Sequence, residues 1–138
     1  MDLENKNILV TGGNGFLGKY VVNEIKKRNV KEIVIPSSKE CDLRKQENCQ
    51  KIVEGVDIIF HLAAHVGGIG LNREKPGELF YDNLMMGVQL LHESKNANVE
   101  KFISLGTVCS YPKFANIPFL EKSIWEGFPE ETNAPYGL

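Results

Sequence analysis

Short apolar segments alternate along the chain with longer stretches in which apolar residues follow helical spacing. The apolar segments cover residues 7–11, 32–35, 57–61 and 101–106. Short segments of this kind, separated by helices, are typical of parallel strands joined by crossover helices. The pattern therefore predicts an α/β fold with a doubly wound parallel sheet, of which about four strands are present.

The first predicted helix follows the first apolar segment directly. Leu17, Val21 and Ile25 repeat every four residues and would form one apolar stripe. Basic residues follow at positions 26–28, where they suit the negative end of a helix dipole. We expect this helix to pack one face on the sheet.

A later predicted helix, at residues 77–96, has little purely polar circumference. Such a helix is typically buried on two sides. One side would face the sheet, and we expect the other to meet a second subunit in a homodimer. The apolar residues are Leu79, Phe80, Leu84, Met85, Met86, Val88, Leu90 and Leu91.

Length and composition indicate one globular domain that handles a small molecule. The chain has 138 residues, 42% of them hydrophobic, and a net charge of −2, which gives no basic surplus for nucleic acid or an anionic membrane. It has no secretory signal pattern and no apolar run near the ~20 residues that span a bilayer, so we expect a cytoplasmic protein. The three cysteines, Cys41, Cys49 and Cys109, show no paired spacing, and we expect free thiols and no metal site.

A glycine-rich turn joins the first strand to the first helix. Gly12, Gly15 and Gly18 follow the apolar run 8–10 and lead directly into the amphipathic stripe. In a strand, turn and helix of this kind, glycines allow a sharp turn, close approach of backbone amides to phosphates, and close packing of helix on strand. We predict that the turn, with Phe16 and Leu17, binds the pyrophosphate of a nicotinamide dinucleotide; an ordinary glycine-rich turn is the alternative.

Residues after the second strand bear on the choice of cofactor. An acid at this place usually holds the ribose 2′-hydroxyl of NAD, and NADP sites avoid that charge. Here Ser37, Ser38 and Lys39 offer two hydroxyls and an ammonium to a 2′-phosphate. The sequence thus favours NADP(H), while Glu40 keeps NAD(H) open.

The glycine spacing, the pair Asp42-Leu43 and the turn Leu62-Ala63-Ala64 resemble the extended short-chain dehydrogenase/reductase family of sugar-nucleotide enzymes. The resemblance implies a Rossmann-like fold, with Asp42 at the adenine. It also implies that Leu43 and the Leu62–Ala64 turn line the adenosine and ribose, with Leu105 part of the cofactor site. Without the resemblance, Asp42 is equally well explained as a helix cap.

Three further segments, 65–69, 107–113 and 133–136, resemble the GDP-L-fucose synthase branch of that family. These are NADPH-dependent 3,5-epimerase/4-reductases of GDP-linked 4-keto-6-deoxy sugars. The resemblance implies that Val66, Gly67 and Gly68 border the sugar and that Asn83 supports the active site. Read alone, Asn83 could simply bond backbone on a helix surface.

The same resemblance implies three catalytic residues. Tyr136 would donate the proton to the reduced carbonyl oxygen, Thr107 would orient that carbonyl, and Cys109 would serve epimerisation as an acid or base. Without it, Thr107 and Tyr136 are ordinary loop residues and Cys109 a small buried hydrophobe.

Two family residues fall outside the sequence. The lysine that lowers the tyrosine pKa would stand at position 140, beyond Leu138, and the histidine that partners the cysteine lies further on. None of His61, His65 and His92 is a good substitute. We therefore expect residues 1–138 to be an incomplete Rossmann domain without the C-terminal substrate domain, and to be inactive alone.

Two alternatives stay open: a non-catalytic dinucleotide-binding fragment, and an epimerase acting on another hexose or heptose nucleotide. A dehydratase ranks last, because it would need an acidic pair where Val108 and Cys109 stand.

Overall fold

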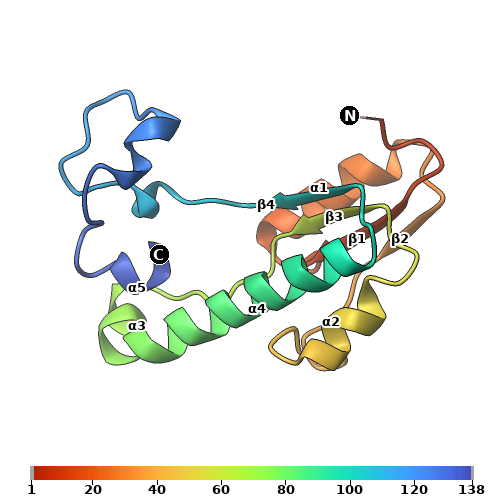
Figure 1. Ribbon diagram of the computed structural model, residues 1–138, viewed down its shortest axis with the longest axis horizontal. Helices are drawn as coiled ribbons and strands as arrows, with labels where there is room; N and C mark the ends of the chain where they lie inside the picture. The colour runs from red at the N-terminus through yellow and green to blue at the C-terminus, as the bar shows by residue number, and fades with distance from the viewer. Residues whose placement is uncertain (1, 138) are drawn as a thin grey trace. The chain divides into compact units, whose positions relative to one another are not determined.

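The computed structural model describes residues 2–137 and contains a parallel sheet of four strands (Figure 1). The strands are β1 (Asn7–Thr11), β2 (Glu32–Val34), β3 (Ile58–His61) and β4 (Lys101–Ser104), in the order β2-β1-β3-β4. Each lies within two residues of a predicted segment. The α/β fold predicted from the apolar pattern, and the Rossmann-like fold that the family resemblance implies, are therefore confirmed.

The central strand β1 carries the core on both sides of the sheet. Leu9 pairs with Val34 on one edge of β1 and with Ile59 on the other. Because side chains alternate along a strand, Leu9 faces one side of the sheet while Ile8 and Val10 face the opposite side. All three are fully buried.

Helix α1 (Phe16–Lys26) covers the Ile8 and Val10 face. Its buried residues are Gly18, Val22 and Ile25. The predicted stripe was wrong by one residue over the first two turns, since Leu17 is 41% exposed. The helix rotates this way because the missing side chain at Gly18 lets its first turn approach the glycine turn closely.

The opposite face of the sheet is covered by α2 (Gln46–Ile52) and by the second half of α4 (Pro76–Asn96). Cys49, Val53 and Leu90 pack there against Leu9 and Ile59. Helices on both faces make the sheet doubly wound, as the sequence predicted.

The described residues form two compact units. The first comprises 2–64 and 85–105, with the whole sheet; the second comprises 65–84 and 106–137. The second contains α3 (Ile69–Glu74), the first turns of α4, two 3-10 turns, η1 (Val108–Ser110) and η2 (Glu121–Trp125), and α5 (Ala134–Gly137). None of the described helices is long and apolar enough to cross a membrane.

Candidate functional site

The glycine turn closes tightly after β1. Gly12 has a φ of +69°, and a Cβ there would lie 2.7 Å from the Ala63 backbone nitrogen. A Cβ on Gly18 would lie 2.2 Å from the Gly12 carbonyl oxygen. The Gly15 amide donates to that same carbonyl at 3.0 Å. The turn therefore has the close backbone approach that the glycine spacing predicted.

The N-terminus of α1 is open to an anion. Gly15 is the N-cap residue, no side chain caps the helix, and its first turn has no acidic residue. The first amides of a helix lack partners within it, and they lie at the positive end of its dipole. A phosphate group suits this position. The Phe16 side chain, which is 85% exposed, has no hydrogen-bond donor, so the backbone amides would hold the phosphate.

A buried hydrogen-bond network ties together the carboxyl ends of β1 and β3. The Ala63 amide donates to Thr11 Oγ1 at 3.3 Å, and Thr11 Oγ1 lies 2.8 Å from His61 Nδ1. The Thr11 hydroxyl has one proton and two lone pairs, so beside the bond that it accepts from the amide it can either donate to Nδ1 or accept from it, according to the tautomer of His61. Burial lowers the pKa of His61 from 6.5 to about 4, so this imidazole is neutral. The network fixes the start of the Leu62–Ala64 turn beside the glycines.

Polar residues after β2 do not all keep their side chains available to a ligand. Ser37 Oγ donates to Glu40 Oε2 at 2.6 Å, which holds a carboxylate near the predicted ribose site. Ser38 and Lys39 are exposed. Two of the three predicted phosphate-binding side chains are thus accessible, and the third is bonded to an acid.

Asp42 is held by a neighbouring arginine. Its Oδ1 accepts from the Arg44 amide at 3.0 Å and from Arg44 Nε at 2.9 Å, and its Oδ2 accepts from Nη2 at 2.9 Å. The bonds from Arg44 lower the Asp42 pKa. The N-cap of α2 is Lys45, so Asp42 is not the helix cap of the alternative interpretation. Leu43 is 5% exposed and packs into the core.

The remaining predicted cofactor residues differ in exposure. Leu62 and Ala63 are half-buried and pack against the core clusters. Ala64 is exposed, and Leu105, just after β4, is 62% exposed. All of the predicted cofactor residues lie in the first unit.

The three predicted catalytic residues lie in the second unit, on two adjoining turns. Thr107 is the N-cap of η1, and its Oγ1 accepts from the Cys109 amide at 3.2 Å. Tyr136 lies on α5, which is joined to η1 by a hydrogen bond from Ser110 Oγ to the Gly137 carbonyl. Cys109 and Tyr136 are both half-buried, so Cys109 is not the fully buried hydrophobe of the alternative interpretation.

The Asn83 side chain hydrogen-bonds the backbone of His65, which precedes the predicted sugar-binding residues 66–68. Its Oδ1 accepts from the His65 amide at 2.7 Å, and its Nδ2 donates to the His65 carbonyl at 2.9 Å and to the Leu79 carbonyl at 2.8 Å. The amide therefore bonds backbone, as the alternative interpretation held, but the backbone of another segment as well as its own helix. Val66, Gly67 and Gly68, which follow His65, are exposed.

Asn72 of α3 also supports this loop. Its Nδ2 lies 3.4 Å from the Gly67 carbonyl and 3.3 Å from the Gly68 carbonyl, and both contacts are hydrogen bonds. Its Oδ1 is buried and has no hydrogen-bond partner among the residues that the structure describes. A buried acceptor of this kind is unusual in a native fold unless a ligand or water completes it.

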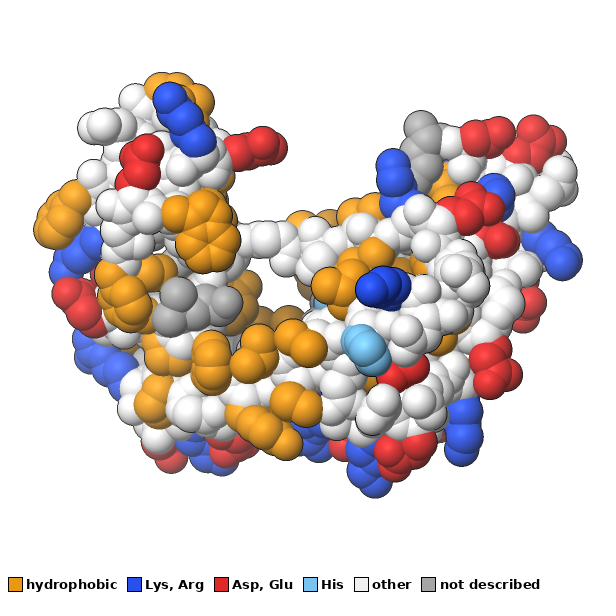
Figure 2. Space-filling model, viewed as in Figure 1, with side chains coloured by type: hydrophobic (Ala, Val, Ile, Leu, Met, Phe, Trp, Pro, Cys, Tyr) orange, Lys and Arg blue, Asp and Glu red, His pale blue; other side chains and the backbone are white. Residues whose placement is uncertain are grey.

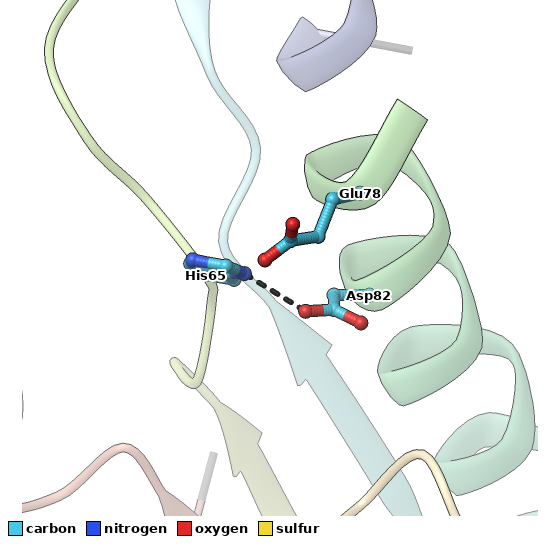
Figure 3. Close-up of side chains that lie close together, drawn as sticks. All are labelled: His65, Glu78 and Asp82. Atoms are coloured by element: carbon cyan, nitrogen blue, oxygen red, sulfur yellow. Dashed lines mark hydrogen bonds and ion pairs between the residues drawn. The ribbon is translucent and has the colours of Figure 1, made fainter. Parts of the chain in front are cut away.

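A cluster of titratable side chains, which was not predicted from the sequence, lies at the same loop (Figure 3). His65 Nδ1 lies 2.8 Å from Asp82 Oδ2, and the Glu78 carboxylate points toward the same imidazole. Donor atoms of the three residues all lie within 4.8 Å of one another. The spacing of four between Glu78 and Asp82 was a usable signal, since it puts both on one helix face. The approach of His65 to that face was not visible in the sequence.

Comparisons with known proteins agree with this architecture. The chain is 35% identical over 133 residues to GDP-L-colitose synthase of Yersinia pseudotuberculosis, covering 95% of this chain and 43% of that protein. It is 32% identical over 138 residues to GDP-L-fucose synthase of Sinorhizobium fredii, covering 99% of this chain and 44% of that protein. The chain thus spans less than half the length of these relatives.

A solved structure is similar over nearly the whole chain. It is MlghC, a GDP-mannoheptose C4 reductase from Campylobacter jejuni with NADP bound, with a TM-score of 0.91, 26% identity, and coverage of 99% of this chain and 44% of that one. Residues 8–138 also match the family described as NAD dependent epimerase/dehydratase. A match over that length shows membership, and the chain belongs to the NAD dependent epimerase/dehydratase family.

Proposed function

We propose that this chain is the cofactor-binding part of an NADP(H)-dependent GDP-sugar 3,5-epimerase/4-reductase that acts on a 4-keto-6-deoxy sugar nucleotide. The observation that carries the proposal is the glycine turn with its uncapped helix N-terminus. Only glycine fits at Gly12 and Gly18, and the first amides of α1, which no side chain caps, suit a pyrophosphate. The relatives' printed names, synthases and reductases of GDP-linked sugars, support the choice of substrate class.

The cofactor would supply a hydride to the carbonyl carbon of the keto sugar. The alkoxide that develops on oxygen then needs a proton, which the Tyr136 hydroxyl would donate. Thr107, at the N-cap of η1 in the same unit, would orient the carbonyl through its hydroxyl. Reduction in this scheme consumes one hydride and one proton for each alcohol formed.

Epimerisation next to a carbonyl requires removal of a proton on one face of the ring and its return on the other. We assign one of these roles to Cys109. The Cys109 amide donates a hydrogen bond to Thr107 Oγ1, and this bond fixes the backbone of Cys109 relative to Thr107, the residue that would orient the carbonyl.

The sugar itself would lie against Val66, Gly67 and Gly68. Two features support this assignment. The loop is exposed, and side-chain hydrogen bonds from Asn83 to His65 and from Asn72 to Gly67 hold its backbone. The unpartnered Asn72 Oδ1 adds an acceptor that a bound ligand or water would complete.

The preference for NADP(H) rests on Ser38 and Lys39, both exposed in the segment that follows β2. The Ser37–Glu40 hydrogen bond works against it, because the carboxylate would repel a 2′-phosphate and suits a 2′-hydroxyl. We expect NADPH to bind more tightly than NADH, since Lys39 contributes a full positive charge.

The function is tested on the intact gene product by following NADPH oxidation with GDP-4-keto-6-deoxymannose. We expect substrate-dependent oxidation, and a loss of about 100-fold or more in kcat in Tyr136→Phe, which removes the proton donor without removing the ring. Dissociation constants for NADPH and NADH, measured by fluorescence, form the second readout. Tight NADPH binding without turnover would reject the reductase and leave a binding module, whereas absence of dinucleotide binding would reject the proposal entirely.

A further inference from the structure

Three side chains of types that can bind a metal converge in the second unit, from a loop and one helix face. His65 follows β3 in the chain, and Glu78 and Asp82 lie four residues apart on α4 (Figure 3). Each offers one nitrogen or oxygen atom within 4.8 Å of the other two. None of these atoms has a role in the function proposed above.

We propose that His65, Glu78 and Asp82 bind one divalent transition-metal ion, with zinc as the best fit. One imidazole nitrogen and two carboxylate oxygens form a donor set that zinc accepts readily. Calcium and magnesium prefer oxygen ligands alone, and neither suits a site with a histidine. Three protein ligands would leave a fourth position for water or for an oxygen of another ligand.

The geometry needs only small adjustments to hold the ion. Two ligands of a tetrahedral zinc ion lie roughly 3.3 Å apart, and His65 Nδ1 lies 2.8 Å from Asp82 Oδ2. The Glu78 side chain is 48% exposed and so has room to close in. Its present ion pair with Lys75, at 3.1 Å, is a surface pair that contributes little to stability.

The two less mobile ligands are already held in place. The His65 backbone is bonded on both sides by Asn83, and the Asp82 side chain is 9% exposed. Metal at Nδ1 would take the position of the proton between His65 and Asp82, and the ring proton would then reside on Nε2. A dication would also offset the repulsion between the Glu78 and Asp82 carboxylates.

The test is isothermal titration calorimetry with zinc on untagged protein, first freed of metal with a chelator and kept free of dinucleotide and sugar. We expect one saturable site per chain. His65→Gln and Glu78→Gln should each weaken binding at least about tenfold, while His92→Gln, an exposed histidine elsewhere on α4, should leave it unchanged. Glu78 is exposed enough that its variant keeps the fold even if the His65 variant disturbs the loop.

Cobalt provides a spectroscopic check on the ligands. Bound by nitrogen and oxygen alone, it gives weak visible bands, whereas an intense near-ultraviolet band would report thiolate ligation by Cys41 or Cys109, both half-buried free cysteines. The proposal is overturned by a thiolate band, by no saturable zinc binding up to roughly 100 µM, or by unchanged affinity in Glu78→Gln. Because no dinucleotide or sugar is present, these outcomes leave the proposed function untouched.

Discussion

Among single residues, His61 has the clearest consequence for stability. It is 8% exposed at the end of β3, and burial lowers its pKa from 6.5 to about 4. The unfolded chain therefore binds a proton at a higher pH than the folded chain does. The titration of His61 therefore leaves the free energy of unfolding unchanged above pH 6.5, and lowers it as the pH falls from 6.5 toward 4.

We expect the free energy of unfolding to drop by up to about 1.4 kcal/mol per pH unit in this window, and by about 3 kcal/mol in all. Urea titrations at half-unit pH steps measure it. His61→Gln should be less stable at neutral pH, but its free energy of unfolding should change less between pH 6.5 and 5. Carboxylates contribute little to the pH dependence in this range. The matched control, His92→Gln, removes an exposed histidine and should keep the wild-type slope. Equal slopes in all three proteins would show that His61 does not titrate as described.

Residue roles could be predicted from the sequence only where a motif fixes the local backbone. Gly12 and Gly18 are such positions, because the turn and the helix that they shape are contiguous in the chain. Bonds between distant residues were not predictable. The His65–Asp82 contact and the hydrogen bonds of Asn83 to the His65 backbone depend on how the loop after β3 folds onto α4. Apolar periodicity carries no information about the path of that loop.

At the scale of elements, the strands were predicted well and the faces of the helices less well. Strand segments are short, apolar and bounded by polar residues, so each was located within two residues of its observed ends. In α1 the apolar stripe pointed to Leu17, but the buried face includes Gly18, since close packing of a residue without a side chain leaves no apolar signal. The apolar pattern predicted no helix beyond residue 106, but η1, η2 and α5 lie there.

The packing of α1 on the glycine turn is tested by Gly18→Ala. The new Cβ would lie 2.2 Å from the Gly12 carbonyl oxygen and 2.6 Å from Gly13 Cα, so backbone must move. We expect a loss of about 2–3 kcal/mol in the free energy of unfolding, from overpacking that no rotamer relieves. Chemical denaturation measures it, and dinucleotide binding should weaken in parallel.

Gly77→Ala is the matched control, because a Cβ at Gly77 meets nothing within 4 Å and the residue lies in the first turn of α4. Its stability should be unchanged or higher by up to about 1 kcal/mol, as expected of alanine in a helix. Equal free energies of unfolding for Gly18→Ala and Gly77→Ala would contradict the close packing of α1 on the glycine turn.

At the scale of the whole molecule, the outer side of α4 carries exposed apolar side chains. Leu90 is buried against the sheet, as the sequence predicted for one side of this helix, and Leu79 is buried in the second unit. Apolar residues on the remaining circumference are exposed, and hydrophobic side chains gather over α4 on the face shown in Figure 2. They are Phe80, Tyr81, Leu84, Val88 and Leu91, which are 39–57% exposed. Apolar surface of this extent on a helix indicates an interaction site.

We expect this surface to form a homodimer in the intact protein, because a two-fold axis would place the exposed apolar side chains of the same helix face in two subunits against each other. Light scattering after size-exclusion chromatography should give twice the subunit mass. Val88→Lys combined with Leu91→Lys should give a monomer with an unchanged fold, since both side chains are about half exposed and the new charges would be desolvated only in the dimer. His92→Lys, a lysine added at an exposed polar position of the same helix, should leave the dimer intact. A wild-type monomer at about 10 µM, where an interface of standard size would still hold, would exclude α4 as a stable interface.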